Sequence, residues 1–477
     1  MGYTSTIPRN MAAPATATLS LEEIEARDPA LHRARSAYFA LLLFTILLYA
    51  RPSDIIPPLR LIPLAQIAAM MAIAAYGFAV IRGQAPLIMT TELKLVLGLT
   101  FFFTMSVPFA FWRSRAFEIL YQDWLKTLII FFLLSQLVFT TDRVRKLLWA
   151  MILCMLFVSA YSLVQRPAMD SEGRMRGAML GFFSGNYLGI AVAVMLPYIA
   201  VLLVSSRSII KSLVLVSTFG LVMLMTVKTA SRGNMICVII SLLLVWALIL
   251  RDSAKARLMG VAFVLAIVVA VLVAPGVFWD RLSTMWDKES YSTSAASLSA
   301  EQSEMQRKTL LMHSIKFTFQ NPVFGLGLGN FPIVNGTVTR DSQSWKGTHN
   351  TYTEVSSEAG IPAFLLFVAL LITSIRSMRR IHQQCHDRPE LAELSLLARA
   401  TQVSILSFML AGFFAHLAYD YYLYYLAGFG VALQAVYDRV KDHVGPAPAA
   451  GNGKPTYGRN EGVGRLRGGS GVRGRAW

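Results

Sequence analysis

The feature that most constrains this chain is a series of long apolar runs, each followed by a short polar stretch that often contains arginine. The runs are about 15 to 22 residues long, close to the length of α-helix that crosses a bilayer. Charged residues make up 15% of the sequence and apolar residues 55%, whereas soluble chains carry about 25% charged residues. The composition excludes a soluble multidomain protein and indicates a polytopic helical membrane protein.

Twelve apolar spans can be marked along the 477 residues. The sequence therefore predicts an all-α polytopic membrane protein with about 12 transmembrane helices and a long outside loop, residues 280–350, between the ninth and the tenth. The predicted spans are 37–50, 61–81, 93–112, 119–139, 147–165, 182–204, 209–227, 234–250, 258–279, 361–376, 402–418 and 421–437.

The chain is predicted to have three parts: a polar N-terminal segment (1–36), a membrane domain (37–437) and a Gly/Arg-rich tail (438–477). The first lacks the basic start and apolar core of a signal peptide. The tail cannot bury a core, so we expect it to be disordered. Lys and Arg are more frequent in the even-numbered connections than in the odd-numbered short ones. Since basic loops stay in the cytoplasm, both termini are predicted to be cytoplasmic.

The formal net charge of +17 raises the question of nucleic-acid binding. The basic residues are spread over loops and the tail, with no basic face interleaved with aromatic residues, so no nucleic-acid partner is predicted. The short outside connections hold more arginines than orientation requires, which indicates an anionic ligand there. Cys154 and Cys237 lie in apolar runs and Cys385 in a charged loop, without CxxC spacing, so neither a disulfide nor a metal cluster is expected.

The outside loop should carry recognition chemistry, because it is the longest polar segment between spans. It contains a pattern typical of an amphipathic helix on the outer membrane surface, which ends at Asn321-Pro322. A glycine-rich turn, residues 324–331, follows; its GxGxG spacing does not match a dinucleotide fingerprint. The apolar positions of the helix are Leu310, Leu311, Ile315 and Phe319, with Arg307, Lys308 and Lys316 between them.

A helix is predicted to begin immediately after His349, because Thr351 and Glu354 match the S/T-x-x-E capping box. Gly360-Ile361-Pro362 should break this helix and begin the tenth span. His349 then lies at a positive helix terminus near the outer interface. Such a terminus attracts phosphate and lowers the pKa of an imidazole, which favours a neutral base.

Two other histidines, His313 and His416, also fall on the outer side. We interpret His313 as a structural hydrogen-bonding residue. His416 precedes the tyrosine cluster of residues 419–422, which is typical of an interfacial aromatic belt. The alternative for these tyrosines is stacking against a sugar.

Arginines from two further segments are expected on the same side. Arg232 opens the eighth span, and Arg174 and Arg176 precede the sixth. The helix dipole disfavours a cation at a helix N-terminus, so helix stability does not account for Arg232. A shared pyrophosphate would, because the guanidinium fork binds phosphate oxygens bidentately. The alternative is that each arginine contacts lipid headgroups.

Several short motifs occur in a familiar order and on one side of the membrane. They resemble the O-antigen ligase family of polytopic glycosyltransferases, over roughly residues 170–380. The motifs are Arg176-Gly177 with Asn186, Thr229 with Ser231-Arg232-Gly233, Arg307 with Asn321-Pro322 and Gly325-Leu326-Gly327, His349-Asn350-Thr351-Tyr352, and Glu358-Ala359-Gly360.

The resemblance implies a multi-pass protein of the bacterial inner membrane with a long periplasmic loop. It implies transfer of a glycan from an undecaprenyl-pyrophosphate-linked oligosaccharide donor to an acceptor glycan, such as the lipid A core or a polysaccharide, with inversion and without cofactor or metal. His349 matches the family's catalytic histidine. The implied pyrophosphate ligands are Arg176 and Arg232, with Arg174 and Arg307 as weaker matches, and the other implied substrate contacts are Asn186, Asn350 and Tyr352.

Two other functions stay open. A polysaccharide polymerase would use the same donor with a second lipid-linked glycan as acceptor. A secondary transporter would need ionisable residues near the midplane and repeated broken helices. Lys94, Asp123 and Lys126 instead lie towards span ends, and the last two are spaced to pair with each other.

Overall fold

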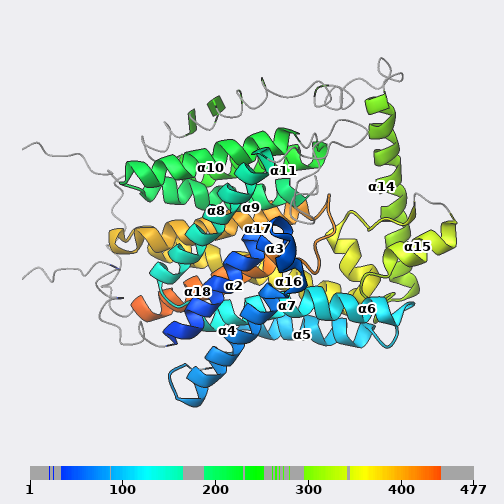
Figure 1. The fold of residues 1–477 in the computed structure, drawn as a ribbon, viewed down its shortest axis with the longest axis horizontal. Helices are drawn as coiled ribbons and strands as arrows, with labels where there is room; N and C mark the ends of the chain where they lie inside the picture. The colour runs from blue at the N-terminus through cyan, green and yellow to red at the C-terminus, as the bar shows by residue number, and fades with distance from the viewer. Residues whose placement is uncertain are drawn as a thin grey trace, which may run out of the picture.

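The structure is a computed structural model that describes residues 34–85, 87–164, 187–228, 231–251, 295–340 and 344–441, with a few isolated positions elsewhere. Within these residues every regular element is helical, as predicted (Figure 1). Most helices run lengthwise in one bundle, and α14 stands across one end of it.

The main helices fall close to the predicted spans, and two of them contain or end in a π-helical turn. They are α2 (Arg35–Ala50), α3 (Pro52–Ile55), α4 (Leu64–Ile81), α5 (Thr91–Ser106), α6 (Arg113–Ile119), which continues through Leu120–Trp124 into α7 (Leu125–Leu137), α8 (Thr141–Val164), α9 (Tyr187–Ser205), α10 (Ile209–Lys228), α11 (Arg232–Val245), extended by Trp246–Leu250, α14 (Ala295–Gln320), α15 (Phe331–Thr339), α16 (Thr351–Cys385), α17 (Ala392–Ala411) and α18 (Tyr421–Val440).

In the described part of the chain, 7 helical stretches are long and apolar enough to cross a membrane. Large apolar side chains on several of them point outward, including Met70, Leu153, Leu213 and Leu243. Such surfaces suit hydrocarbon rather than water, since a helix satisfies its own backbone groups. The protein is therefore a polytopic helical membrane protein. The 7 stretches are Arg35–Ile55, Leu64–Ile81, Thr141–Val164, Ile209–Lys228, Arg232–Leu250, Thr351–Cys385 and Pro389–Ala411.

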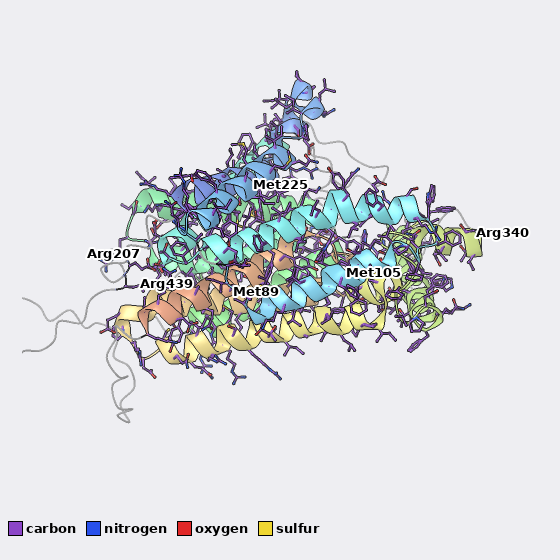
Figure 2. The ribbon with its side chains drawn as sticks, turned by 90° about the horizontal axis from the view of Figure 1, so that it is seen from below. Met89, Met105, Arg207, Met225, Arg340 and Arg439 are labelled. Carbon is purple, nitrogen blue, oxygen red and sulfur yellow. The ribbon has the colours of Figure 1, made fainter. Side chains whose placement is uncertain are left out.

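Connections predicted on the same side of the membrane lie at the same end of the bundle. Figure 2 shows Arg439 at one end and Arg340 at the other. The Arg439 guanidinium lies over the ring of Phe139, 4.5 Å from its centroid, in the connection before α8. Arg145 in the first turn of α8 pairs with Glu393 in the first turn of α17, with Nε and Oε1 3.3 Å apart.

Close approach and interhelical hydrogen bonds hold the helices together, as is usual where lipid removes the hydrophobic driving force between helices. The Tyr425 hydroxyl on α18 donates to Thr45 on α2 across 2.9 Å. Gly428 lets α18 approach α7, because a Cβ there would come within 2.9 Å of the Leu134 side chain.

Two predicted spans differ from the helices observed. The span at 93–112 ends early, at Ser106, because the backbone N–H groups of Phe111 and Trp112 bond to Leu326 and Asn330 in the glycine-rich turn instead of continuing the helix. The helix predicted at 402–418 begins and ends earlier in the chain than expected.

The helix that corresponds to the predicted span 402–418 is α17, which runs from Ala392 to Ala411 and leaves residues 412–420 as a loop. The charged residues Glu393 and Arg399 interrupt the apolar pattern in the first turns of this helix, so the pattern did not indicate that the helix begins there. The ninth span, 258–279, lies outside the described residues except for isolated positions, as does the predicted tail beyond residue 441.

The described part of segment 280–350 contains two helices, α14 and α15, which share a small apolar cluster with the glycine-rich turn (Figure 1). Leu310 is buried as the sequence suggested, but Ile315 and Phe319 are 43% and 73% exposed. The buried side of α14 passes instead through Phe317 and Ser314. The spacing predicted the helix correctly, but it did not predict which side of the helix packs against the rest of the protein.

Candidate functional site

The site is organised around the start of α16. Its first residue is Thr351, so the helix begins immediately after His349 and Asn350, close to the prediction. The predicted capping box is wrong: Asn350 is the N-cap, and its side chain accepts hydrogen bonds from the N–H groups of Tyr352 and Thr353 at 3.0 and 3.1 Å. His349 has a φ of 52°, which turns the chain sharply before the cap.

The His349 imidazole packs edge-on against that of His416, with ring centroids 5.3 Å apart. Its Nδ1 atom is buried and has no hydrogen-bond partner among the described residues. Burial lowers the pKa of His349 to about 3, and the nearby charges of Arg307 and Lys346 act in the same direction. Burial also lowers the pKa of His416. His349 is therefore neutral, with a buried ring nitrogen that could accept a proton.

A cavity of about 520 Å³ opens beside His349. Its walls come from α11, α14, the chain before α16 and the loop after α17. Three cationic side chains and one carboxylate line it, so its electrostatic potential favours an anion. The lining residues are Arg232, Gly233, Ile236, Glu304, Arg307, Lys308, Leu311, Thr348, His349, Asn350, Phe413 and Phe414.

Two helix N-termini meet at this cavity. Arg232 is the first residue of α11, as predicted, and Asn350 caps α16. Both termini carry partial positive charge, which adds to that of the guanidinium groups. Gly233 packs against Phe414, where a Cβ would meet the side chain at 3.3 Å, and this contact brings α11 close to the loop after α17.

The glycine-rich turn docks onto α16 through its backbone. The N–H groups of Leu326 and Gly327 donate to the carbonyls of Ser357 and Glu358 at 2.8 and 2.9 Å. Gly360, with a φ of 88°, kinks α16 as predicted, and a Cβ there would collide with the Val323 carbonyl.

The buried Glu358 carboxylate completes this docking. It accepts hydrogen bonds from the N–H groups of Gly329 and Phe331 at 2.6 and 3.0 Å and from the Tyr419 hydroxyl at 2.6 Å. Gly325, Gly327 and Gly329 all have positive φ, which glycine adopts without a steric penalty. One side chain therefore fixes both the turn and the loop after α17.

The loop of residues 412–420 is held against α16 from a second point. The Thr351 hydroxyl donates to the Ala415 carbonyl at 2.8 Å and accepts from the Leu417 N–H at 3.1 Å. The buried Glu354 carboxylate accepts from the Ala418 N–H at 2.9 Å. These contacts place His416 beside His349.

The predicted site residues fall into three groups. His349, Asn350, Arg232 and Arg307 line the cavity. Tyr352 does not: its hydroxyl donates to the Met409 carbonyl at 2.8 Å, and its ring packs on Phe413. Three of the predicted residues lie outside the described part of the chain: Arg174, Arg176 and Asn186.

Of the other predictions for the outer side, the one for His313 is confirmed and the one for the tyrosine cluster is wrong in part. His313 is structural as predicted, since its Nδ1 lies 2.6 Å from the Asn335 amide oxygen and joins α14 to α15. The interfacial belt is wrong for two of the tyrosines, because Tyr419 and Tyr422 are only 9% and 3% exposed. They pack inside the protein rather than facing lipid.

The sequence did not single out Glu304, Lys308 and Thr348 as cavity residues. Glu304, Arg307 and Lys308 follow one another at helical spacing on α14, which could have indicated a shared face. Nothing in the sequence indicated that His416 lies beside His349, because the two residues are far apart in the chain and only the folded loop brings them together.

Comparison with known proteins agrees with this geometry. Residues 218–368 match the family model described as O-antigen ligase. No curated protein matches the chain. The matched segment contains Arg232, Arg307, His349 and Asn350, the four predicted residues that line the cavity. Over this segment, the chain is similar to the O-antigen ligase family.

Proposed function

We propose that the protein transfers a glycan from an undecaprenyl-pyrophosphate donor to an acceptor sugar at the periplasmic face of the bacterial inner membrane. The observation that carries the proposal is one cavity that holds a neutral, buried histidine, His349, together with Arg232 and Arg307. A proton acceptor beside a cationic surface is what displacement of a pyrophosphate requires.

In the reaction, His349 takes the proton of the acceptor hydroxyl while its oxygen attacks the anomeric carbon. The bond from that carbon to the pyrophosphate oxygen breaks, and undecaprenyl pyrophosphate leaves with its charge held by Arg232 and Arg307. A single displacement inverts the anomeric centre. The step uses no nucleotide sugar or metal. Arg174, Arg176, Asn186 and Asn350 stay as predicted substrate contacts, whereas Tyr352 does not, because its hydroxyl bonds to the Met409 carbonyl and its side chain does not line the cavity.

The proposal includes an arrangement in the membrane. Twelve spans within residues 37–437 would place segment 280–350 between the ninth and tenth on the periplasmic side, with both termini in the cytoplasm. The location of Arg439 and Arg340 at opposite ends supports placing segment 280–350 and the C-terminal end of α18 on different sides of the membrane (Figure 2). A polymerase would use the same cavity and donor, so the acceptor alone separates it from a ligase.

The test is reconstitution with an undecaprenyl-pyrophosphate-linked glycan, scored for transfer to lipid A core or to a second lipid-linked glycan. Loss of a positioned base lowers the rate roughly 10²- to 10⁴-fold, so we expect His349→Ala to lose transfer with normal membrane abundance. His386→Ala, at an exposed histidine in the last turns after α16, is the control. Near wild-type turnover of His349→Ala would refute the assignment, and inhibition by EDTA would refute the metal-free route.

The arginine is tested by a change that keeps its charge. Arg232→Lys removes the fork that grips two oxygens, and we expect about a tenfold or greater fall in transfer. Arg340→Lys, at an exposed position after α15, should act as wild type. Equal activity of both variants would mean that Arg232 only orients the loop or meets lipid headgroups.

A further inference from the structure

A second and larger cavity is lined by the end of the loop of residues 412–420 and the start of α18. We propose that it binds a sugar residue of one of the two substrates, so that the loop separates the reacting end of a glycan from a more distant part of the same chain. The proposal rests on the proposed function and extends it. The cavity measures about 720 Å³, and its lining includes Arg51, Asp54, Asp123, Lys126, Tyr419 and Asp420.

The charges in this cavity are arranged differently from those beside His349. Arg51 and Asp54 form an ion pair with Nε and Oδ2 3.1 Å apart. Lys126 and Asp123 pair at 3.5 Å, as their spacing predicted. Arg60, the third cation of the lining, bonds to the backbone carbonyls of Ser53 and Asp54. With Asp420 as the third carboxylate, the positive and negative side chains of the lining are equal in number. This pattern suits a neutral ligand with many hydroxyl groups better than a pyrophosphate.

Asp420 adds an acceptor that the protein itself does not use. Its backbone N–H bonds to the Leu417 carbonyl, and it begins α18 without a side-chain capping bond. Its carboxylate makes no hydrogen bond or ion pair with the residues that the structure describes, and it faces the charges of Asp123, Lys126 and Arg51. A partly buried carboxylate of this kind is stabilised by a hydroxyl donor.

Aromatic rings complete the wall. The lining includes Tyr419, which is fixed by its bond to Glu358, and also Tyr421 and Tyr422. Because Tyr419 and Tyr422 are buried, Tyr421 is the tyrosine that can present its ring to a ligand. Tyrosine offers an apolar face together with a polar tip, which matches the apolar C–H faces and hydroxyl edges of a pyranose ring. The Thr127 hydroxyl, also in the lining, donates to the backbone carbonyl of Tyr419 at 2.9 Å and holds this part of the loop in place.

The loop limits the distance between the two cavities. Phe414 lines the first and Tyr419 the second, five residues further on. Fully extended chain covers at most about 3.6 Å per residue, so the two Cα atoms lie no more than about 18 Å apart. The linings of the two cavities therefore approach within a distance that an oligosaccharide of several sugar units can span.

Occupancy is measured by protection of a cysteine from a maleimide reagent on purified protein in detergent. Ser53→Cys places the thiol in the cavity lining, and Glu118→Cys places one at an exposed site on α6 as the matched control. The three natural cysteines are buried, so background labelling is low. The probes are a lipid-free core oligosaccharide, the glycan-bearing undecaprenyl-pyrophosphate donor, and undecaprenyl pyrophosphate without glycan.

We expect one of the two glycan probes to slow labelling of Ser53→Cys several-fold and to leave Glu118→Cys unchanged. Protection by the core oligosaccharide assigns the cavity to the acceptor, and protection by the glycan-bearing donor alone assigns it to the donor. Equal protection by undecaprenyl pyrophosphate without glycan would overturn the proposal, because a lipid or its phosphate would then fill the space. Protection by no probe would overturn it as well.

Kinetics give a second measurement that does not depend on labelling. Asp420→Ala should raise KM for the substrate identified above about tenfold, the usual effect of losing a charged hydrogen bond, with kcat nearly intact. Asp420→Asn keeps one acceptor oxygen and should recover part of the loss. Unchanged KM for both substrates, in a protein whose His349→Ala variant is inactive, would reject the second cavity and leave the proposed function standing.

Discussion

The Tyr419 hydroxyl donates to the Glu358 carboxylate across 2.6 Å, and this bond ties the loop after α17 to the kink of α16. Glu358 also accepts from two backbone N–H groups of the glycine-rich turn. Three separate segments therefore converge on one buried carboxylate.

This convergence predicts a graded loss of stability. Tyr419→Phe removes one of three donors and should cost about 1–3 kcal/mol. Glu358→Gln should cost more, because its amide NH₂ faces groups that are themselves donors. The measurement is the midpoint of thermal unfolding in detergent, with Tyr121→Phe, at a 60% exposed tyrosine, as control. Midpoints of both variants equal to that of Tyr121→Phe would contradict the role of the carboxylate.

The kink of α16 predicts a difference between two glycines. Gly360→Ala forces a side chain into positive φ and against the Val323 carbonyl, and we expect a loss of at least about 1–3 kcal/mol. Gly220→Ala lies in α10 with open space around it and should be neutral or stabilise by about 0.5–1 kcal/mol. Comparable expression and unfolding midpoints for the two variants would show that the kink is not required.

The pH dependence of transfer separates two titrating groups. The pKa of His349 is lowered to about 3 by burial, so its base form is present throughout the working range. The pKa of Asp420 is raised to about 7, first by burial and then by Asp123. Its carboxylate therefore forms as the pH rises through that value, and kcat/KM should rise with it.

The comparison is made with Asp420→Asn. We expect its kcat/KM to be nearly flat between about pH 5 and 8, because His349 stays neutral there. If kcat/KM of Asp420→Asn still rises with pH around 6.5, then His349 titrates normally and its ring is solvated in the working enzyme.

The two ends of the bundle predict opposite accessibility. Figure 2 places Arg207 and Arg439 at one end and Arg340 at the other. In intact cells, an impermeant maleimide should label Arg340→Cys from the periplasm and should label Arg207→Cys only after the inner membrane is opened. Labelling in the reverse order would place the His349 cavity in the cytoplasm and exclude a periplasmic reaction.

The sequence predicted features whose cause is local. The helix start after His349, the break at Gly360 and the turn of residues 324–331 follow from capping, glycine and proline chemistry that acts within a few residues. Arg232 at the start of α11 was found for the same reason. One local prediction was wrong: the side chain of Asn350, and not that of Thr351, caps the N-terminus of α16.

Features that depend on distant contacts could not be predicted. Thr351 and Glu354 matched a capping box, yet both side chains bond to the loop after α17, more than sixty residues away in the chain. Residues 107–112 are apolar enough for a helix, but their backbone pairs with the glycine-rich turn. In each case, a tertiary hydrogen bond replaced the local one that the pattern implied.

Arg232 is the first residue of a membrane-spanning helix, so its side chain lies where that helix leaves the apolar layer. Under the proposed function, a lipid-linked donor presents its charged group there while its hydrocarbon chain stays among the lipids. Such a donor would arrive by diffusion in two dimensions, and occupancy of the site would follow its mole fraction in the membrane rather than its bulk concentration. Adding inert detergent to an assay at constant donor would therefore slow the reaction by surface dilution.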